Sequence, residues 1–201
     1  MTAPALDFWF EFASTYSYPA AMRIGPLANK AGVKVNFRPF LLGPIFKAQG
    51  WDTSPFNLFP AKGRYMWRDV ERTCVALALP FNRPETFPQA SLLAARVALV
   101  GLGATWGEDF SRAVYRTQFA QGRRIDDAET IRAILADLKL DAAAALEAAQ
   151  SGAIKEKLRT QTAEAQQRGI FGAPTFITAD GELFWGNDRL EDALAWATRL
   201  Q

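Results

Sequence analysis

The stretch D-F-W-F-E-F-A-S-T-Y-S, residues 7–17, is an apolar run that leads directly into a helical pattern. Phe and Trp dominate the run with little alternation, which indicates a strand buried on both faces. The run ends at Phe12, and the helical pattern opens after Ser14. A side chain at such a junction lies among free backbone N–H groups, at the positive end of a helix dipole, where an anion is stabilised. Ser14 is therefore the first candidate functional residue.

The segments that follow predict an α/β fold. Residues 17–31 have a helical pattern that ends at Gly32, and residues 33–40 alternate as a second strand. Strand, helix and strand in this order form a βαβ unit with parallel strands and a right-handed crossover. A loop rich in Gly, Pro and aromatic residues is expected over residues 42–60, followed by five to seven helices over residues 61–169.

Strand character returns only near the end of the chain. Residues 173–178 and 183–185 are expected to pair across a turn, and residues 189–200 to form a terminal amphipathic helix. The order βαβ, helical block, ββα predicts a thioredoxin-like fold with one mixed four-stranded sheet. We expect residues 1–60 and 166–201 to form the thioredoxin-like domain, and residues 61–165 to be an inserted helical domain.

The composition excludes several classes of function. Of 201 residues, 49% are apolar, and 23 basic residues nearly balance 21 acidic ones. This predicts a sizeable core and gives no reason to expect nucleic acid or a membrane as partner. The first six residues lack the basic region of a signal peptide, so a cytoplasmic protein is expected. There is no histidine and one cysteine, Cys74, so we expect no metal site, no intrachain disulfide and a packed core position for Cys74.

Four motifs in order resemble one known family. They are FEFASTYSY (10–18), PAKGRYMWRDVER (60–72), FGAPTFI (171–177) and FWGNDRLEDAL (184–194). With these four motifs, the chain resembles the DsbA-like proteins of the kappa-class glutathione transferase and 2-hydroxychromene-2-carboxylate isomerase group. The thiol-redox members carry C-x-x-C where this chain has Ser14-Thr15-Tyr16-Ser17, so dithiol exchange at this position is chemically excluded.

The resemblance implies that glutathione is the cofactor and that the Ser14 hydroxyl donates to its sulfur. One hydrogen bond to a charged group contributes about 1.5–3 kcal/mol. Lowering a thiol pKa by about two units requires about 2.7 kcal/mol. A serine assisted by a helix N-terminus is thus sufficient without histidine. The alternative interpretation of Ser14 is a plain helix cap.

Further site residues also rest on the resemblance. It implies a cis peptide bond between Ala173 and Pro174, with the Ala173 backbone pairing with the cysteinyl unit of glutathione. The γ-glutamyl end is expected at the following residues: Trp185, Gly186, Asn187 and Asp188. A turn with a helix cap is the simpler interpretation of that segment.

The substrate side is less defined. Lys47 is expected to bind a substrate carboxylate, and either Asn57 or Thr53 to contact glutathione. Tyr65 is a candidate substrate contact, although its spacing with Asp69 and Arg72 equally fits a surface ion-pair network.

The resulting hypothesis is a glutathione-dependent isomerase of an aromatic carboxylate from aromatic catabolism, such as 2-hydroxychromene-2-carboxylate. The thiolate would add reversibly to the substrate, allow rotation about a single bond, and be regenerated. The alternatives are a kappa-type glutathione transferase or peroxidase, and a thioredoxin-fold binding module without catalysis. The resemblance also implies a homodimer.

Overall fold

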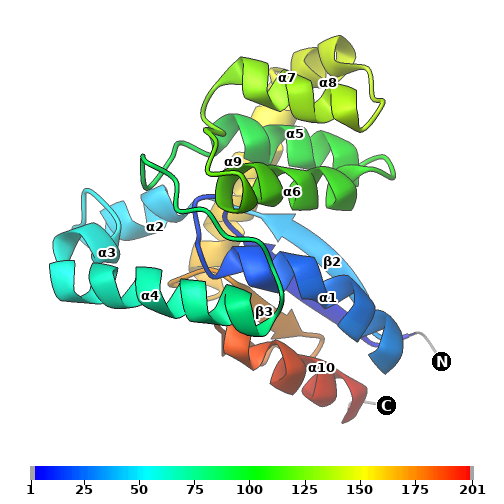
Figure 1. Ribbon diagram of the computed structural model, residues 1–201. Coiled ribbons are helices and arrows are strands. Elements are labelled where there is room, and N and C mark those ends of the chain that lie inside the picture. The colour runs from blue at the N-terminus through cyan, green and yellow to red at the C-terminus, as the bar shows by residue number, and fades with distance from the viewer. Residues whose placement is uncertain (1–2, 200–201) are drawn as a thin grey trace.

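Strand β1 (Ala5–Phe10) is one of two inner strands of a mixed sheet in the computed structural model, which describes residues 3–199 (Figure 1). The sheet order is β2-β1-β3-β4. Strand β2 (Lys34–Pro39) pairs with β1 in parallel, and β3 (Thr175–Thr178) pairs with it in antiparallel fashion. Strand β4 (Leu183–Trp185) completes the edge beside β3. The predicted four-stranded mixed sheet is confirmed.

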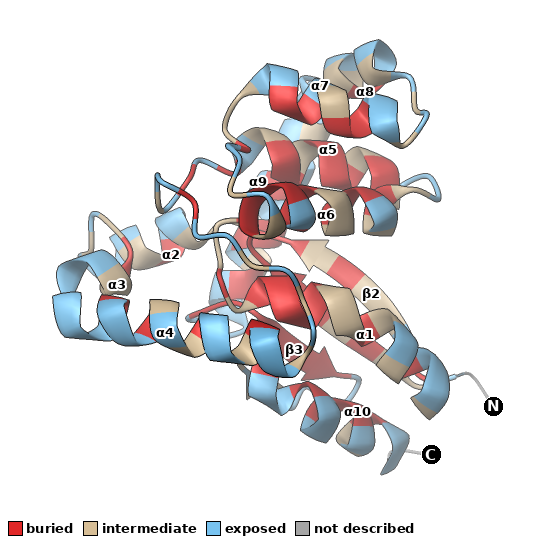
Figure 2. Ribbon diagram, viewed as in Figure 1, coloured by how far each residue is buried: buried red, intermediate tan, exposed pale blue. Residues whose placement is uncertain are grey.

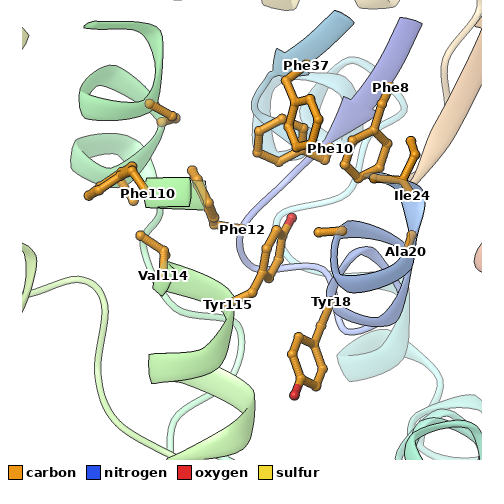
Figure 3. Close-up of a cluster of buried hydrophobic side chains, with 14 of the residues drawn as sticks. Phe8, Phe10, Phe12, Tyr18, Ala20, Ile24, Phe37, Phe110, Val114 and Tyr115 are labelled. Atoms are coloured by element: carbon orange, nitrogen blue, oxygen red, sulfur yellow. The ribbon is translucent and has the colours of Figure 1, made fainter. Parts of the chain in front are cut away.

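The side chains of β1 alternate between two cores. Phe8 and Phe10 point toward α1 (Ser17–Ala31) and α6 (Gly107–Tyr115), where Phe37 of β2 joins them (Figure 3). The terminal helix α10 (Leu190–Arg199) packs on the same core. Trp9 points the other way and packs with Phe40 and with residues near the end of α9 (Gly152–Gln167). The sheet is therefore covered on both faces, as the unbroken apolar run predicted.

Helix α1 has the predicted bounds, Ser17–Ala31. It ends because Gly32 adopts a left-handed conformation with φ of 67°, in which its N–H reaches the carbonyl groups of Ala28 and Asn29. Later in the chain, a short 3-10 turn (Asn187–Arg189) precedes α10. Leu200, which the expected terminal helix included, lies outside the described residues.

The helical block lies between β2 and β3 in sequence. Its elements are α4 (Pro60–Ala76), α5 (Leu92–Leu102), α6, a π-helical turn (Arg116–Ala120), α7 (Ala128–Asp137), α8 (Ala142–Ala149) and α9. Helices α5 to α8 stack together above the sheet, whereas α4 extends to the other side of α1 (Figure 1). Much of the outer surface of α4 is exposed (Figure 2).

The prediction of a loop over residues 42–60 was wrong. The structure has two short helices there, α2 (Leu42–Ala48) and α3 (Pro55–Leu58). Helices of seven and four residues are too short to show a 3.6-residue period. Helix α3 starts from local chemistry instead: Pro55 occupies its first turn, and the Ser54 hydroxyl accepts the Phe56 N–H. Within residues 3–199, the helices are all too short or too polar to cross a membrane.

Candidate active site

Ser14 lies in the turn between β1 and α1. Its hydroxyl donates a hydrogen bond of 2.7 Å to the carbonyl of Ala173. The same oxygen accepts the backbone N–H of Ser17, the first residue of α1, at 3.3 Å. A hydroxyl has one proton, which here points to Ala173, and the oxygen faces the N-terminus of the helix. The peptide bond between Ala173 and Pro174 is cis, as expected.

A cavity of about 620 Å³ opens beside Ser14. This volume is typical of a site for a small organic ligand. Four groups of residues form its walls: the Ser14 turn, α2 with the α3 region, the segment before α5, and residues 171–173 with Trp185. Most of the walls are apolar, and the aromatic members are Tyr16, Phe46, Trp51, Phe56, Phe87, Phe171 and Trp185. The peptide bond between Phe87 and Pro88, which the sequence did not predict, is also cis and lies in the third wall.

Trp185 stands at the rim of the cavity with 51% of its surface exposed. Its ring packs against Phe171, with centroids 4.9 Å apart, and lies directly on Gly172. A Cβ atom on Gly172 would come within 2.4 Å of the indole nitrogen, so Gly172 allows this close approach. Trp185 is thus brought beside Ala173 and Ser14, as expected.

Asn187 and Asp188 take different positions. Asn187 is buried, and its side-chain oxygen accepts a hydrogen bond of 3.1 Å from Arg23 of α1. Asp188 is exposed and pairs with Arg189 at 3.3 Å. Both lie outside the cavity lining, as do Pro174 and Gly186. Burial, and then the hydrogen bond and charge of Asp69, raise the pKa of Tyr16 in the cavity lining, and the charge of Asp188 adds to this effect.

Lys47 and Tyr65, expected to contact the substrate, and Asn57, expected to contact glutathione, also lie outside the cavity lining. Lys47 is exposed on α2, and the Asn57 side chain donates to Thr53 at 3.1 Å. Thr53 itself does line the cavity. Tyr65 is exposed and shares Asp69 with Tyr16 and Arg72, which is the surface network that its spacing also allowed.

Three charged residues of the cavity were missed, one of which is Asp52 in the loop between α2 and α3. Lys62 of α4 is the one basic residue among the described residues that line it. It belongs to the segment 60–72 that carried the resemblance, so its position there was the available signal. Glu11 lies at the end of β1 with 4% of its surface exposed, and burial raises its pKa. An acidic residue inside an apolar strand was the signal in that case.

Cys74 packs in the core between α4 and α1, as expected, and burial raises the pKa of its thiol to about 11. Among residues 3–199, no group of three or more acidic, Cys or His side chains is arranged to hold a metal ion. The candidate site itself consists of a serine hydroxyl at a helix N-terminus, beside a backbone carbonyl and an apolar cavity.

Comparison with known proteins gives consistent matches over nearly the whole chain. The family model described as "DSBA-like thioredoxin domain" matches residues 5–195. A 2-hydroxychromene-2-carboxylate isomerase of Sphingobium xenophagum is 33% identical, with 92% of this chain and 94% of the relative aligned. Human glutathione S-transferase kappa 1 is 26% identical, with 92% and 87% aligned. The solved structure of a 2-hydroxychromene-2-carboxylate isomerase superposes with a TM-score of 0.85 and 27% identity, covering 98% of this chain and 95% of the other.

Proposed function

Since the chain belongs to the family of DSBA-like thioredoxin domains, we propose that it is a glutathione-dependent isomerase of the 2-hydroxychromene-2-carboxylate type. The observation that carries the proposal is the Ser14 hydroxyl, 2.7 Å from the Ala173 carbonyl at the edge of a mostly apolar cavity. The chain has no cysteine pair, so it cannot exchange disulfides itself, but it can bind a thiol that a small molecule supplies. An isomerisation needs no net redox change and fits this residue set.

The residues around Ser14 fit a bound tripeptide thiol. An extended ligand backbone can donate its N–H to the Ala173 carbonyl, which now accepts from Ser14. The serine proton is then free to turn to the ligand's sulfur. The Ser17 N–H keeps the hydroxyl in place from the other side. When bound, glutathione supplies a thiolate nucleophile that adds reversibly to an electrophilic carbon and relieves a double-bond constraint.

The ends of the ligand are assigned from the surrounding residues. Trp185 stands at the rim, and Gly186, Asn187 and Asp188 follow it outside the cavity lining. We assign this segment to the γ-glutamyl end of the ligand, with the Asp188 carboxylate toward the ligand ammonium. Arg23 holds the buried Asn187 side chain in place. Thr53, which lines the cavity, is the better candidate than Asn57 for a contact at the other end. The aromatic walls accept a flat, apolar substrate ring.

The cation for the substrate carboxylate is assigned to Lys62 in place of Lys47. Lys62 lines the cavity, and its ammonium lies 4.9 Å from the centre of the Phe59 ring. Lys62→Ala is expected to raise KM for the carboxylate substrate about fivefold, with little change in kcat, because an ion pair near solvent contributes about 1 kcal/mol or less. Lys47→Ala, from the exposed side of α2, is the matched control and should change KM less than twofold. A larger effect of Lys47→Ala would reverse the assignment.

The reaction class is tested by turnover with glutathione and 2-hydroxychromene-2-carboxylate. The substrate should convert to its trans ring-opened isomer while total glutathione stays constant. A transferase or peroxidase, which is the second candidate because kappa-class relatives share this fold, consumes glutathione in proportion to product. Failure to bind glutathione at millimolar concentration in a calorimetric titration would favour a binding module without catalysis.

We also propose a homodimer. The arm formed by α3 and α4 carries exposed apolar side chains at Leu58, Phe59, Tyr65 and Val75, which a second subunit would cover. Gel filtration should give twice the mass of the chain, and elution as a monomer would contradict the proposal. The cytoplasmic location stays a prediction.

A further inference from the structure

Glu11 is an unusual residue for its position. It follows the apolar strand β1, has 4% of its surface exposed, and lines the cavity three residues before Ser14. A buried carboxylate is costly to keep unless hydrogen bonds satisfy it. Nothing in the proposed chemistry around Ser14 uses it, so its role needs a separate explanation.

The Glu11 carboxylate accepts hydrogen bonds from three segments of the chain. One oxygen accepts the backbone N–H of Leu42, the first residue of α2, at 2.9 Å. The other accepts the backbone N–H of Ala13, in the Ser14 turn, at 3.3 Å, and also the hydroxyl of Ser91. Ser91 lies at the N-cap position of α5 without capping that helix, because its hydroxyl is directed to Glu11.

These three donors belong to three of the four walls of the cavity. Leu42 begins the α2 wall, Ser91 immediately precedes α5, and Ala13 adjoins Ser14. We propose that Glu11 is a positioning residue, which holds the α2 and α5 walls against the Ser14 turn and so gives the glutathione and substrate site its shape. The effect of Glu11 on glutathione binding rests on the proposed function, whereas its role in joining the walls is independent of that function.

The positioning depends on the ionised form of Glu11. A carboxylate accepts at both oxygens, whereas the protonated acid, or a glutamine, presents a donor at one of its two positions and releases at least one wall. The titratable group in contact with Glu11 is Tyr115 of α6, whose hydroxyl donates to the Glu11 carbonyl at 2.9 Å. The other charged or titratable residues that share the cavity lining with it are Tyr16, Asp52 and Lys62.

Lowering the pH should therefore increase the contribution of Glu11 to stability and, at the same time, disrupt the geometry of the site. Burial raises the pKa of Glu11 in the folded state above its ordinary value, so the folded protein binds this proton more tightly than the unfolded chain. The contribution of this group to stability consequently rises as pH falls through the raised pKa. Protonation of Glu11 releases the walls over the same pH range. The protein should therefore lose affinity for its ligand although its stability is not lowered.

The test compares Glu11→Gln with Glu147→Gln, which removes an exposed carboxylate on α8. Glutathione affinity is measured by calorimetry, and the backbone amide signals of Ala13, Leu42 and Leu92 are followed by NMR. Glu11→Gln should weaken glutathione binding at least tenfold and shift all three amide signals, with an unfolding temperature that is not lowered. Glu147→Gln should change neither. In the wild-type protein, the Leu42 and Ala13 amide signals should titrate together, at a pH above the ordinary pKa of a glutamate side chain.

The outcomes separate the two proposals. Wild-type glutathione affinity in Glu11→Gln, with unmoved Leu42 and Leu92 signals, would overturn the positioning role. If the wild-type protein binds no glutathione, the proposed function fails, and the amide signals alone decide whether Glu11 joins the walls. If Glu11→Gln does not fold, the wild-type pH titration decides: Leu42 and Ala13 signals that do not titrate with Glu11 would contradict the inference.

Discussion

Ser14→Ala is expected to lower turnover by about ten- to a hundredfold and to raise the pKa of the bound thiol by about one to two units. The loss of one hydrogen bond to a charged group, about 1.5–3 kcal/mol, sets both magnitudes. The thiolate would keep the N-terminus of α1 but lose the Ser14 hydroxyl, and Ser17 reaches this point through its backbone N–H rather than its side chain. The thiol pKa is read from the ultraviolet absorbance of the thiolate as pH is varied, and turnover from steady-state kinetics.

Two further variants make the result specific to the Ser14 hydroxyl. Ser14→Thr keeps a donor at the same carbon and should recover part of the activity. Ser17→Ala removes a hydroxyl from the same turn but keeps the backbone N–H, and should retain most of the turnover. Full activity in Ser14→Ala, with an unchanged thiol pKa, would remove Ser14 from the mechanism.

Phe8→Ala is expected to destabilise the protein by about 3–5 kcal/mol, the usual cost of deleting a buried aromatic ring. Phe8 has no exposed surface, and its ring packs against Phe10 and Phe176, at centroid distances of 5.1 and 5.5 Å, and edge-on against Phe37 at 5.2 Å (Figure 3). These rings come from β1, β2 and β3, so a cavity at Phe8 weakens the centre of the sheet. Since small proteins are stable by about 5–15 kcal/mol, the loss is a large fraction.

The measurement is the free energy of unfolding from denaturant titration. Phe171→Ala removes the same ring from the rim of the cavity, where 47% of Phe171 is exposed, and should cost about 1 kcal/mol or less. If Phe8→Ala cost no more than Phe171→Ala, the central packing described for the sheet would be incorrect.

The sequence predicted those parts of the fold whose signals are local. The Phe-rich run of β1, the helical pattern of α1 and the glycine at its end follow from neighbouring residues, and the structure has them at or near the predicted bounds. The wrong prediction concerned α2 and α3, since a helix of one or two turns shows no periodicity and depends on what it packs against. The cis bond before Pro88 had no motif that would indicate it.

The same distinction applies to the site. Ser14, Ala173 and Trp185 belong to recognisable motifs, and the structure brings them together around one cavity. Lys47 was predicted and Lys62 was missed, because the place of Lys62 in the cavity lining depends on how the start of α4 packs rather than on the residues beside it. The bond between Glu11 and Ser91 joins residues 80 positions apart, and no local pattern records such a contact.

The central claim is that the Ser14 hydroxyl holds the sulfur of bound glutathione. The most direct measurement is a crystal structure of the protein with glutathione. We expect the sulfur within hydrogen-bonding distance of the Ser14 oxygen, and the cysteinyl backbone paired with Ala173. Glutathione bound with its sulfur away from Ser14, or crystals that exclude glutathione at concentrations that saturate related isomerases, would contradict this account.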